Sequence, residues 1–133
     1  MGSASPLGPS SIGLDPKVSA GLGYLVGILA IIFFFIEKQN RFVRFHALQT
    51  ILLGISVAVL YIVLVILGIT SAFIDRSGTL TGLIFGLGSF VVWGASFVAW
   101  LLGMINAFMG KYFKLPVIGD YAEKYANQGI GGL

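Results

Sequence analysis

The sequence predicts an all-α protein, an integral membrane helical bundle with three transmembrane helices and a short C-terminal interfacial amphipathic helix. Of its 133 residues, 57% are hydrophobic and only 10% are charged, a composition far outside the range of soluble domains. The apolar residues fall into three long runs without a charge, and the charged residues gather around those runs. A soluble fold this small could not bury so much apolar surface, whereas a bilayer removes the need to bury it.

The composition also predicts how the chain is divided. Residues 1–17 form a flexible polar N-terminal leader, residues 18–126 a three-span membrane domain with an interfacial tail, and residues 127–133 a flexible glycine-rich C-terminus. The leader lacks the basic region of a secretory signal, and no small-residue cleavage site follows the first apolar run. We therefore expect that run to remain as an anchor.

The first predicted span is Val18–Ile36, whose nineteen residues suffice to cross roughly 30 Å of hydrocarbon. Asp15 and Pro16 just before it are typical of a helix start. Gly23 and Gly27, four residues apart, predict a small-residue face that packs closely against another helix.

The second predicted span covers Ala47–Ile69 and carries a similar face at Gly54 and Ala58. A polar turn at Ser71–Thr81 separates it from the third apolar run, Leu80–Met109. That run is about 45 Å long as a helix, too short for two spans, so it predicts one tilted or kinked helix.

Two faces are distinguished on the third span. Ala95, Ala99 and Gly103 continue the small-residue pattern, which predicts packing within the bundle. Trp93, Phe97 and Trp100 lie on a different face, where the alternatives are lipid contact and docking of another membrane subunit. We favour docking. Beyond the helix-interrupting Pro116, apolar residues at helical spacing from Val117 to Tyr125 predict the amphipathic interfacial helix.

The basic residues predict an orientation. Six of the eight lie in the first loop and the tail, and two, Lys17 and Arg76, lie elsewhere. With three spans, the positive-inside rule puts the N-terminus outside and the C-terminus in the cytoplasm.

A charged stretch from Glu37 to Gln49 lies between the first two runs. Within it, a predicted interface set for lipid headgroups contains Lys38, Arg41, Arg44, His46 and Gln49. For the arginines three alternatives stay open, namely a topology signal, binding of anionic lipid, and docking of a partner's acidic segment. Glu37 is expected to pair with Arg41 four residues later.

Catalytic and cofactor chemistry is not expected. The chain has one histidine and no cysteine, so neither a histidine pair nor a thiolate site for metal can form within it. The spans carry no acidic residue of the kind that proton-coupled transporters use. The scattered basic residues do not predict a nucleic-acid groove. We therefore expect no enzyme activity, no cofactor, no metal and no nucleic-acid partner.

Two phrases carry a family resemblance: Ile-Glu-Lys-Gln-Asn-Arg-Phe-Val-Arg-Phe-His-Ala-Leu-Gln-Thr, residues 36–50, and Tyr-Phe-Lys-Leu-Pro-Val-Ile-Gly-Asp-Tyr-Ala-Glu, residues 112–123. Over about residues 15–126 the chain resembles small bacterial and archaeal membrane proteins of unassigned function. These are grouped with the import component of the chloroplast inner envelope, the Tic-twenty-like family. The chloroplast members take part in protein import and usually show four spans rather than three, whereas the small prokaryotic members have no general assigned activity. The resemblance to these prokaryotic members implies a location in a prokaryotic inner membrane.

Two functions of different classes follow. The favoured hypothesis is a non-enzymatic accessory or assembly subunit of a larger membrane complex, with membrane lipids and other membrane subunits as partners. The alternative is a homo-oligomeric, translocon-like conduit for peptides or small solutes, for which the spans offer only scattered polar residues.

Overall fold

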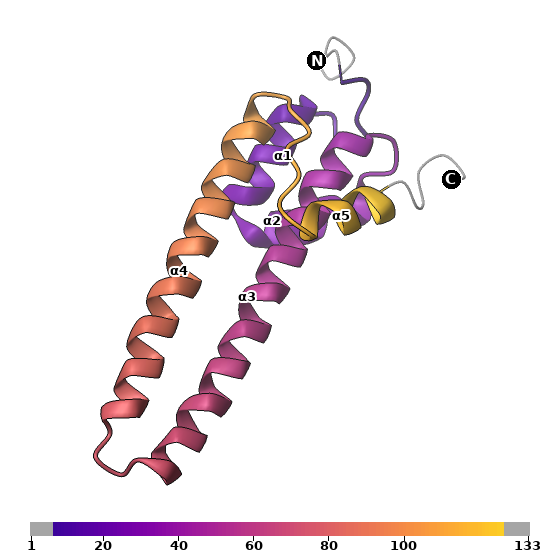
Figure 1. The fold of residues 1–133 in the computed structure, drawn as a ribbon. Helices are drawn as coiled ribbons and strands as arrows, with labels where there is room; N and C mark the ends of the chain where they lie inside the picture. The colour runs from indigo at the N-terminus through magenta and orange to yellow at the C-terminus, as the bar shows by residue number, and fades with distance from the viewer. Residues whose placement is uncertain (1–6, 127–133) are drawn as a thin grey trace. The chain divides into compact units, whose positions relative to one another are not determined.

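The computed structural model describes residues 7–126, which form five helices and no strand. The helices are α1 (Pro16–Leu25), α2 (Gly27–Ile36), α3 (Arg41–Ile74), α4 (Thr79–Phe108) and α5 (Ile118–Ala126), shown in Figure 1. The prediction of an all-helical fold is confirmed for the described residues. Residues 1–6 of the predicted flexible leader (1–17) and the predicted flexible C-terminus (127–133) lie outside the described residues.

Two helices, α3 and α4, are long and apolar enough to cross a membrane. The helix α3 contains the whole second predicted span, and α4 and α5 each differ by one residue at both ends from the predicted third span and the predicted amphipathic tail helix. The prediction of three transmembrane helices is not confirmed, because the first apolar run is not one helix.

The first run breaks at Val26, whose backbone is extended between α1 and α2. Each of the two helices has ten residues, which gives about 15 Å, half of the hydrocarbon thickness. Glycines lower helix stability here. A Cβ on Gly23 would lie 3.4 Å from the Cα of Ala30, an ordinary van der Waals contact, so α1 and α2 pack against each other at this position. The predicted packing role of Gly23 fits this contact, whereas Gly27 has no atom within 4 Å of a Cβ position.

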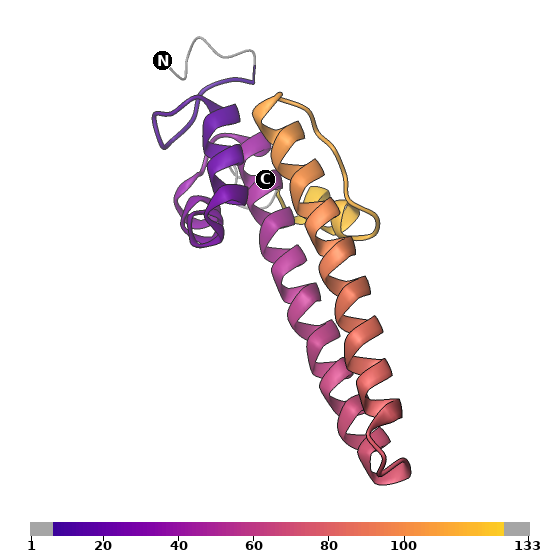
Figure 2. The same cartoon turned by 90° about the vertical axis from the view of Figure 1, so that its left-hand side faces the viewer.

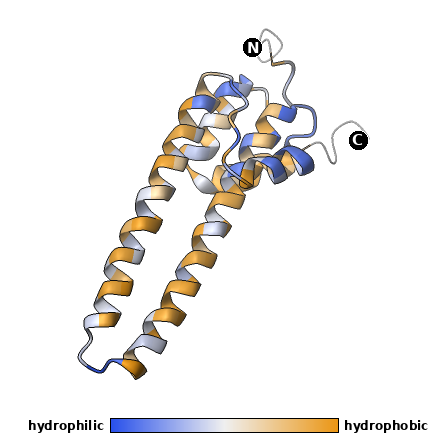
Figure 3. Ribbon diagram, viewed as in Figure 1, coloured by the Kyte–Doolittle hydropathy of each residue, from blue (hydrophilic) through white to orange (hydrophobic). Residues whose placement is uncertain are grey.

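The chain forms two compact units, Met1–Leu53 with Ala99–Leu133 and, separately, Gly54–Val98. In the second unit, the parts of α3 and α4 that it contains run side by side and are joined by a short turn (Figure 2). Figure 3 shows that apolar residues predominate along both helices and polar residues lie at the turn. Asp75 organises that turn, because its carboxylate accepts hydrogen bonds from the backbone N–H groups of Ser77 and Leu80.

The helix contacts of the second unit differ from those predicted. Gly68 faces the ring of Phe85 and Gly88 faces Leu64, each so closely that a Cβ would lie within 2.3 Å of a side-chain atom. By contrast, Gly54 has open space around it and Ala58 and Ala95 are exposed. Spacing showed which small residues share a face, and it did not show which face meets the neighbouring helix.

The first unit holds the buried core. Tyr24, Phe42 and Ala107 pack together with Ala20, and Trp100, Met104 and Leu7 cover them. A second cluster joins Phe45 of α3 to Ala122 and Ala126 of α5. Gly103, predicted as a packing residue, is buried against Tyr24, where a Cβ would lie 2.6 Å from the ring, and Ala99 next to it is half-buried.

Candidate functional site: a buried polar core

Polar side chains are concentrated inside the first unit. Six of them form what we call the polar core, and all except Arg44, at 4%, are no more than 2% exposed: Tyr24, Glu37, Asn40, Arg44, His46 and Gln49. Buried polar groups destabilise a fold unless they are hydrogen-bonded. The contacts of each residue therefore show what the core does.

His46, Tyr24 and Gln49 form one continuous network. His46 Nε2 lies 2.9 Å from the carbonyl oxygen of Lys111, so this nitrogen carries the proton and donates it. His46 Nδ1 is then an acceptor, and the Tyr24 hydroxyl donates a hydrogen bond to it at 3.2 Å. The tyrosine oxygen in turn accepts from Gln49 Nε2 at 2.6 Å. Every donor thus meets an acceptor when the imidazole is neutral.

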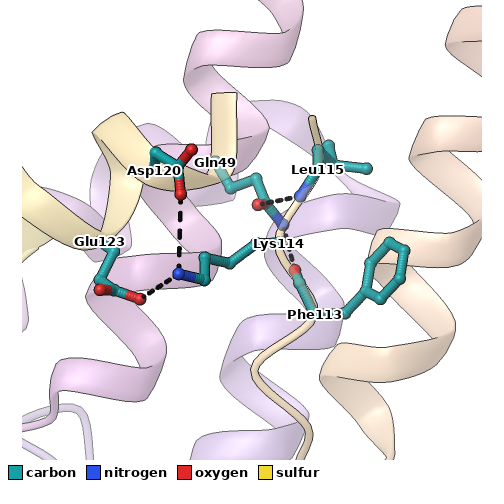
Figure 4. Close-up of polar contacts among 6 residues, drawn as sticks. All are labelled: Gln49, Phe113, Lys114, Leu115, Asp120 and Glu123. Carbon is teal, nitrogen blue, oxygen red and sulfur yellow. Dashed lines mark hydrogen bonds and ion pairs between the residues drawn. The ribbon is translucent and has the colours of Figure 1, made fainter. Parts of the chain in front are cut away.

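Gln49 extends the network to the segment after α4. Its amide nitrogen donates to the carbonyl of Phe113 at 3.0 Å, and its amide oxygen accepts from the backbone N–H of Leu115 at 3.0 Å. Figure 4 shows this two-sided contact beside the ion pairs of Lys114 with Asp120 and Glu123, at 3.6 and 2.9 Å. These ion pairs with the two carboxylates raise the pKa of Lys114. The network fixes residues 111–115 against α3.

Arg44 stabilises the C-terminal ends of two helices. Its Nη1 donates to the carbonyls of Phe34 and Glu37 at the end of α2, at 2.7 and 2.8 Å. Its Nε donates to the carbonyl of Ala126, the last residue of α5, at 3.0 Å. The guanidinium also lies 4.4 Å from the ring centroid of Phe34. Helix ends leave carbonyls without intrahelical partners, and a cation there is also favoured by the helix dipole.

The loop formed by residues 37–40 binds the chain's own N-terminal segment. The carboxylate of Glu37 accepts from the Ser10 hydroxyl and from the Ser11 N–H, at 2.9 Å for the latter. The Asn40 amide donates to the carbonyls of Leu7 and Pro9, at 2.9 and 3.1 Å. These bonds fix residues 7–11, which belong to the predicted leader.

These bonds also set the ionisation of Glu37. Burial raises the pKa of the carboxyl group, but the hydrogen bonds from Ser10, Ser11, Gln39 and Asn40 together outweigh it, so the pKa is lowered. Its expected pairing with Arg41 does not occur, because no ion pair joins the two among the described residues. Arg41 instead lies over the ring of Tyr112.

The predicted interface set is therefore divided. Arg44, His46 and Gln49 are buried and bonded inside the fold, whereas Lys38 is exposed and Arg41 is half-buried. Lys38 also precedes α3, which begins at Arg41, so it shares no helix face with the two arginines.

The predicted docking set is divided as well. Trp93 and Phe97 are 67% and 55% exposed, but Trp100 is half-buried and its indole donates to the carbonyl of Tyr24 at 2.6 Å. Sequence reasoning missed Tyr24 and Asn40 as parts of a site. Tyr24 could have been recognised from the sequence, because it is a tyrosine beside glycines in the middle of an apolar run.

The sequence matches a known protein family over most of its length. Residues 15–122 match the magnetosome magnetite crystal formation protein family. The chain belongs to this family. The expected membership of the Tic-twenty-like family is wrong, because the matched family and the relatives below account for nearly the whole chain.

Two archaeal relatives support the assignment to a membrane protein family. A UPF0132 membrane protein of Methanocaldococcus jannaschii is 40% identical over 121 residues, which is 90% of this chain and 96% of the relative. A UPF0132 membrane protein of Archaeoglobus fulgidus is 36% identical over 121 residues, 90% of this chain and 100% of the relative. No solved structure matches the chain significantly. Together with the two long apolar helices, these relatives identify a membrane protein.

Proposed function

We propose that this protein is a non-enzymatic accessory or assembly subunit of a membrane complex, acting through its surfaces. The observation that carries the proposal is how the polar core is used. The groups most suited to chemistry, His46, Glu37 and Arg44, are buried and hydrogen-bonded to backbone and side-chain groups of the same chain. They hold the first unit together, which leaves apolar helix faces and the exposed cations to meet other molecules.

The family is described by magnetite crystal formation. From this description we propose for this chain a role in assembly. A membrane-anchored subunit that helps to assemble a larger machinery is compatible with that description. Residues 7–126 hold no group of three or more His, Asp or Glu side chains that could bind a metal ion. The proposal therefore gives the protein an assembly role and assigns it no iron site.

The proposed topology has two spans, α3 and α4. Ser10 and Glu37 flank the first apolar run on either side, and they are hydrogen-bonded to each other. A run that crossed the bilayer would separate them by about 30 Å. The pair α1 and α2 therefore enters and leaves the membrane on one side, as short apolar helices can.

With two spans, both ends of the chain lie on the same side. Seven basic residues belong to the first unit, and Arg76 alone lies in the turn between the spans. By the positive-inside rule this side is the cytoplasm. The N-terminal segment is therefore proposed to be cytoplasmic, whereas three spans predicted an external N-terminus.

The first unit is proposed to rest at the membrane interface through α5. This helix buries Gly119, Ala122 and Ala126 and exposes Tyr121 and Tyr125. Lys124 lies over the ring of Tyr125, at 5.4 Å. Tyrosine rings and lysines suit headgroup depth. Within the predicted interface set, anionic lipid remains a proposed partner for the two cations that stay accessible, Lys38 and Arg41.

The partner surface is proposed on α4 around Trp93 and Phe97. Native mass analysis after extraction in a mild detergent tests the proposal. We expect complexes of fixed stoichiometry with other membrane proteins, reduced at least tenfold by Trp93→Leu with the melting temperature unchanged. Val91→Ala, on the same helix and 64% exposed, is the matched control. A chain that appears only alone or only with copies of itself would contradict the accessory role, and a ring of copies would favour the conduit.

A further inference from the structure

The contact between residues 7–11 and the loop 37–40 has the form of a peptide bound in a receptor site. We call residues 7–12 the strap and residues 37–40 the clamp. Most of the bonds involve the backbone of the strap: Asn40 Nδ2 reaches the carbonyls of Leu7, Gly8 and Pro9 at 2.9, 3.4 and 3.1 Å. The Ser11 N–H lies 2.9 and 3.1 Å from the two carboxylate oxygens of Glu37.

Three further contacts add side-chain selectivity. The Ser10 hydroxyl donates to Glu37, and the Ser11 hydroxyl accepts from the Lys38 N–H at 3.1 Å. Leu7 packs against the core cluster that contains Tyr24 and Phe42. The clamp thus fits a peptide with an apolar anchor followed, three and four positions later, by two hydroxyl residues at the start of a turn.

The clamp is built to remain occupied. Glu37 and Asn40 are 0% and 2% exposed, and without the strap the Asn40 amide nitrogen would lose all of its three acceptors in the described residues. An unsatisfied buried polar group costs on the order of 1–3 kcal/mol. Loss of the strap is therefore disfavoured unless an equivalent segment takes its place.

We propose that the strap is exchanged between two copies of this chain, so that each clamp binds residues 7–12 of the other copy. The inference rests on the proposed assembly role and gives it a mechanism. A second copy carries the same segment, and exchange preserves every contact between strap and clamp. Such swapping needs only a hinge. Gly13, at φ 85°, follows the strap directly and has no atom near its Cβ position, so the chain can change direction there at low cost.

Thiol cross-linking of the full-length protein tests the exchange, because the chain has no cysteine of its own. Ser11 and Lys38 are exposed, and they are in contact across the strap and clamp. Two differently tagged single variants, Ser11→Cys and Lys38→Cys, are co-expressed, extracted in mild detergent and treated with a short bismaleimide. Exchange predicts a product that carries both tags. A Ser11→Cys, Lys38→Cys double variant, expressed alone and diluted, reports the contact within one chain.

Two controls separate exchange from collision and from misfolding. Lys124→Cys, an exposed position of the first unit on the same proposed side of the membrane, replaces Lys38→Cys and measures random encounters. Asn40→Ser in the Lys38→Cys chain removes the amide donor but keeps an oxygen that can cap α3 in place of Asn40. We expect the doubly tagged product to exceed the Lys124 control at least fivefold and to fall at least fivefold with Asn40→Ser. A product no greater than the Lys124 control, with efficient cross-linking inside the double variant, would overturn the exchange and leave the test of the accessory role unaffected.

Discussion

The indole Nε1 of Trp100 donates a 2.6 Å hydrogen bond to the carbonyl oxygen of Tyr24. Tyr24 lies in the last turn of α1, where carbonyl groups have no partner within the helix. The tryptophan therefore completes the end of α1 from α4, and it lies against the core rather than on an outward face. The break at Val26 depends on such contacts, since the carbonyls exposed by ending a helix early must find donors elsewhere.

Trp100→Phe is predicted to destabilise the protein. The substitution leaves the Tyr24 carbonyl without its donor, which costs about 1–3 kcal/mol. Trp93→Phe is the matched control, because Trp93 is 67% exposed on the same helix and should change stability little. Thermal unfolding in detergent, followed by far-UV circular dichroism, measures both. Equal melting temperatures for the two variants would mean that the indole contact contributes nothing.

The long helices could be predicted from the sequence, and the polar core could not. α4 follows from thirty residues without a charge, and α5 from apolar spacing after Pro116. The polar core depends on contacts between residues far apart in the chain, such as Arg44 with Ala126. Its partners are mostly backbone carbonyls, which leave no trace in side-chain composition. A cation next to an aromatic residue looks the same in sequence whether it meets a headgroup or a helix end.

The broken first run could have been suspected. Gly21, Gly23 and Gly27 lower helix stability around Val26, but the same glycines also suit close packing of an intact span. Choosing between these interpretations requires the contact of Ser10 with Glu37, which no local pattern reports.

Arg44→Lys is predicted to destabilise the first unit although the charge is kept. A lysine has one nitrogen and cannot donate to Phe34, Glu37 and Ala126 from a planar fork. Hydrogen bonds from charged groups contribute about 1.5–3 kcal/mol each, so a loss on the order of 3 kcal/mol is expected. Arg41→Lys, at a half-buried position, should cost less than about 1 kcal/mol. Chemical denaturation in detergent compares them, and similar midpoints would argue against the helix-end role of Arg44.

Gly103→Ala is predicted to lower stability, and Gly94→Ala is its control in the same helix. A Cβ at Gly103 would lie 2.6 Å from the Tyr24 ring and 2.8 Å from its hydroxyl oxygen, whereas Gly94 has open space. Overpacking costs about 1–3 kcal/mol, while alanine in an open helical position gains up to about 1 kcal/mol over glycine. The two melting temperatures should therefore move in opposite directions, and a shared increase would show that Tyr24 yields without cost.

The two-span topology predicts which positions share a side of the membrane. Single cysteines at Ser11, Gln39 and Lys124 should all be protected from an impermeant thiol reagent in intact cells, and Ser77→Cys should react. The four positions are exposed in the structure, so access to each depends on the membrane. If Ser11→Cys were labelled and Gln39→Cys were not, the first apolar run would have to cross the membrane.

Glu37 is predicted to stabilise the fold in a pH-dependent way. Although burial raises the pKa of this carboxyl group, hydrogen bonds from Ser10, Ser11, Gln39 and Asn40 lower it below the ordinary value of 4.5. A carboxyl whose folded pKa is depressed binds fewer protons in the folded state than in the unfolded one. Its contribution is therefore complete above pH 4.5 and disappears as the pH falls through the folded pKa.

Subtraction isolates this contribution from that of the other acids, which titrate in the same range. The free energy of unfolding of Glu37→Gln is subtracted from that of the parent protein at each pH, in the same detergent. The difference should be constant between about pH 6 and 8, because the carboxylate is fully charged in both states. Below pH 4.5 it should fall steadily, since protonation removes the acceptor that holds Ser10 and Ser11. A difference that stays constant down to pH 3 would show that the strap does not depend on the charge of Glu37, and a difference that grows on acidification would contradict the lowered pKa itself.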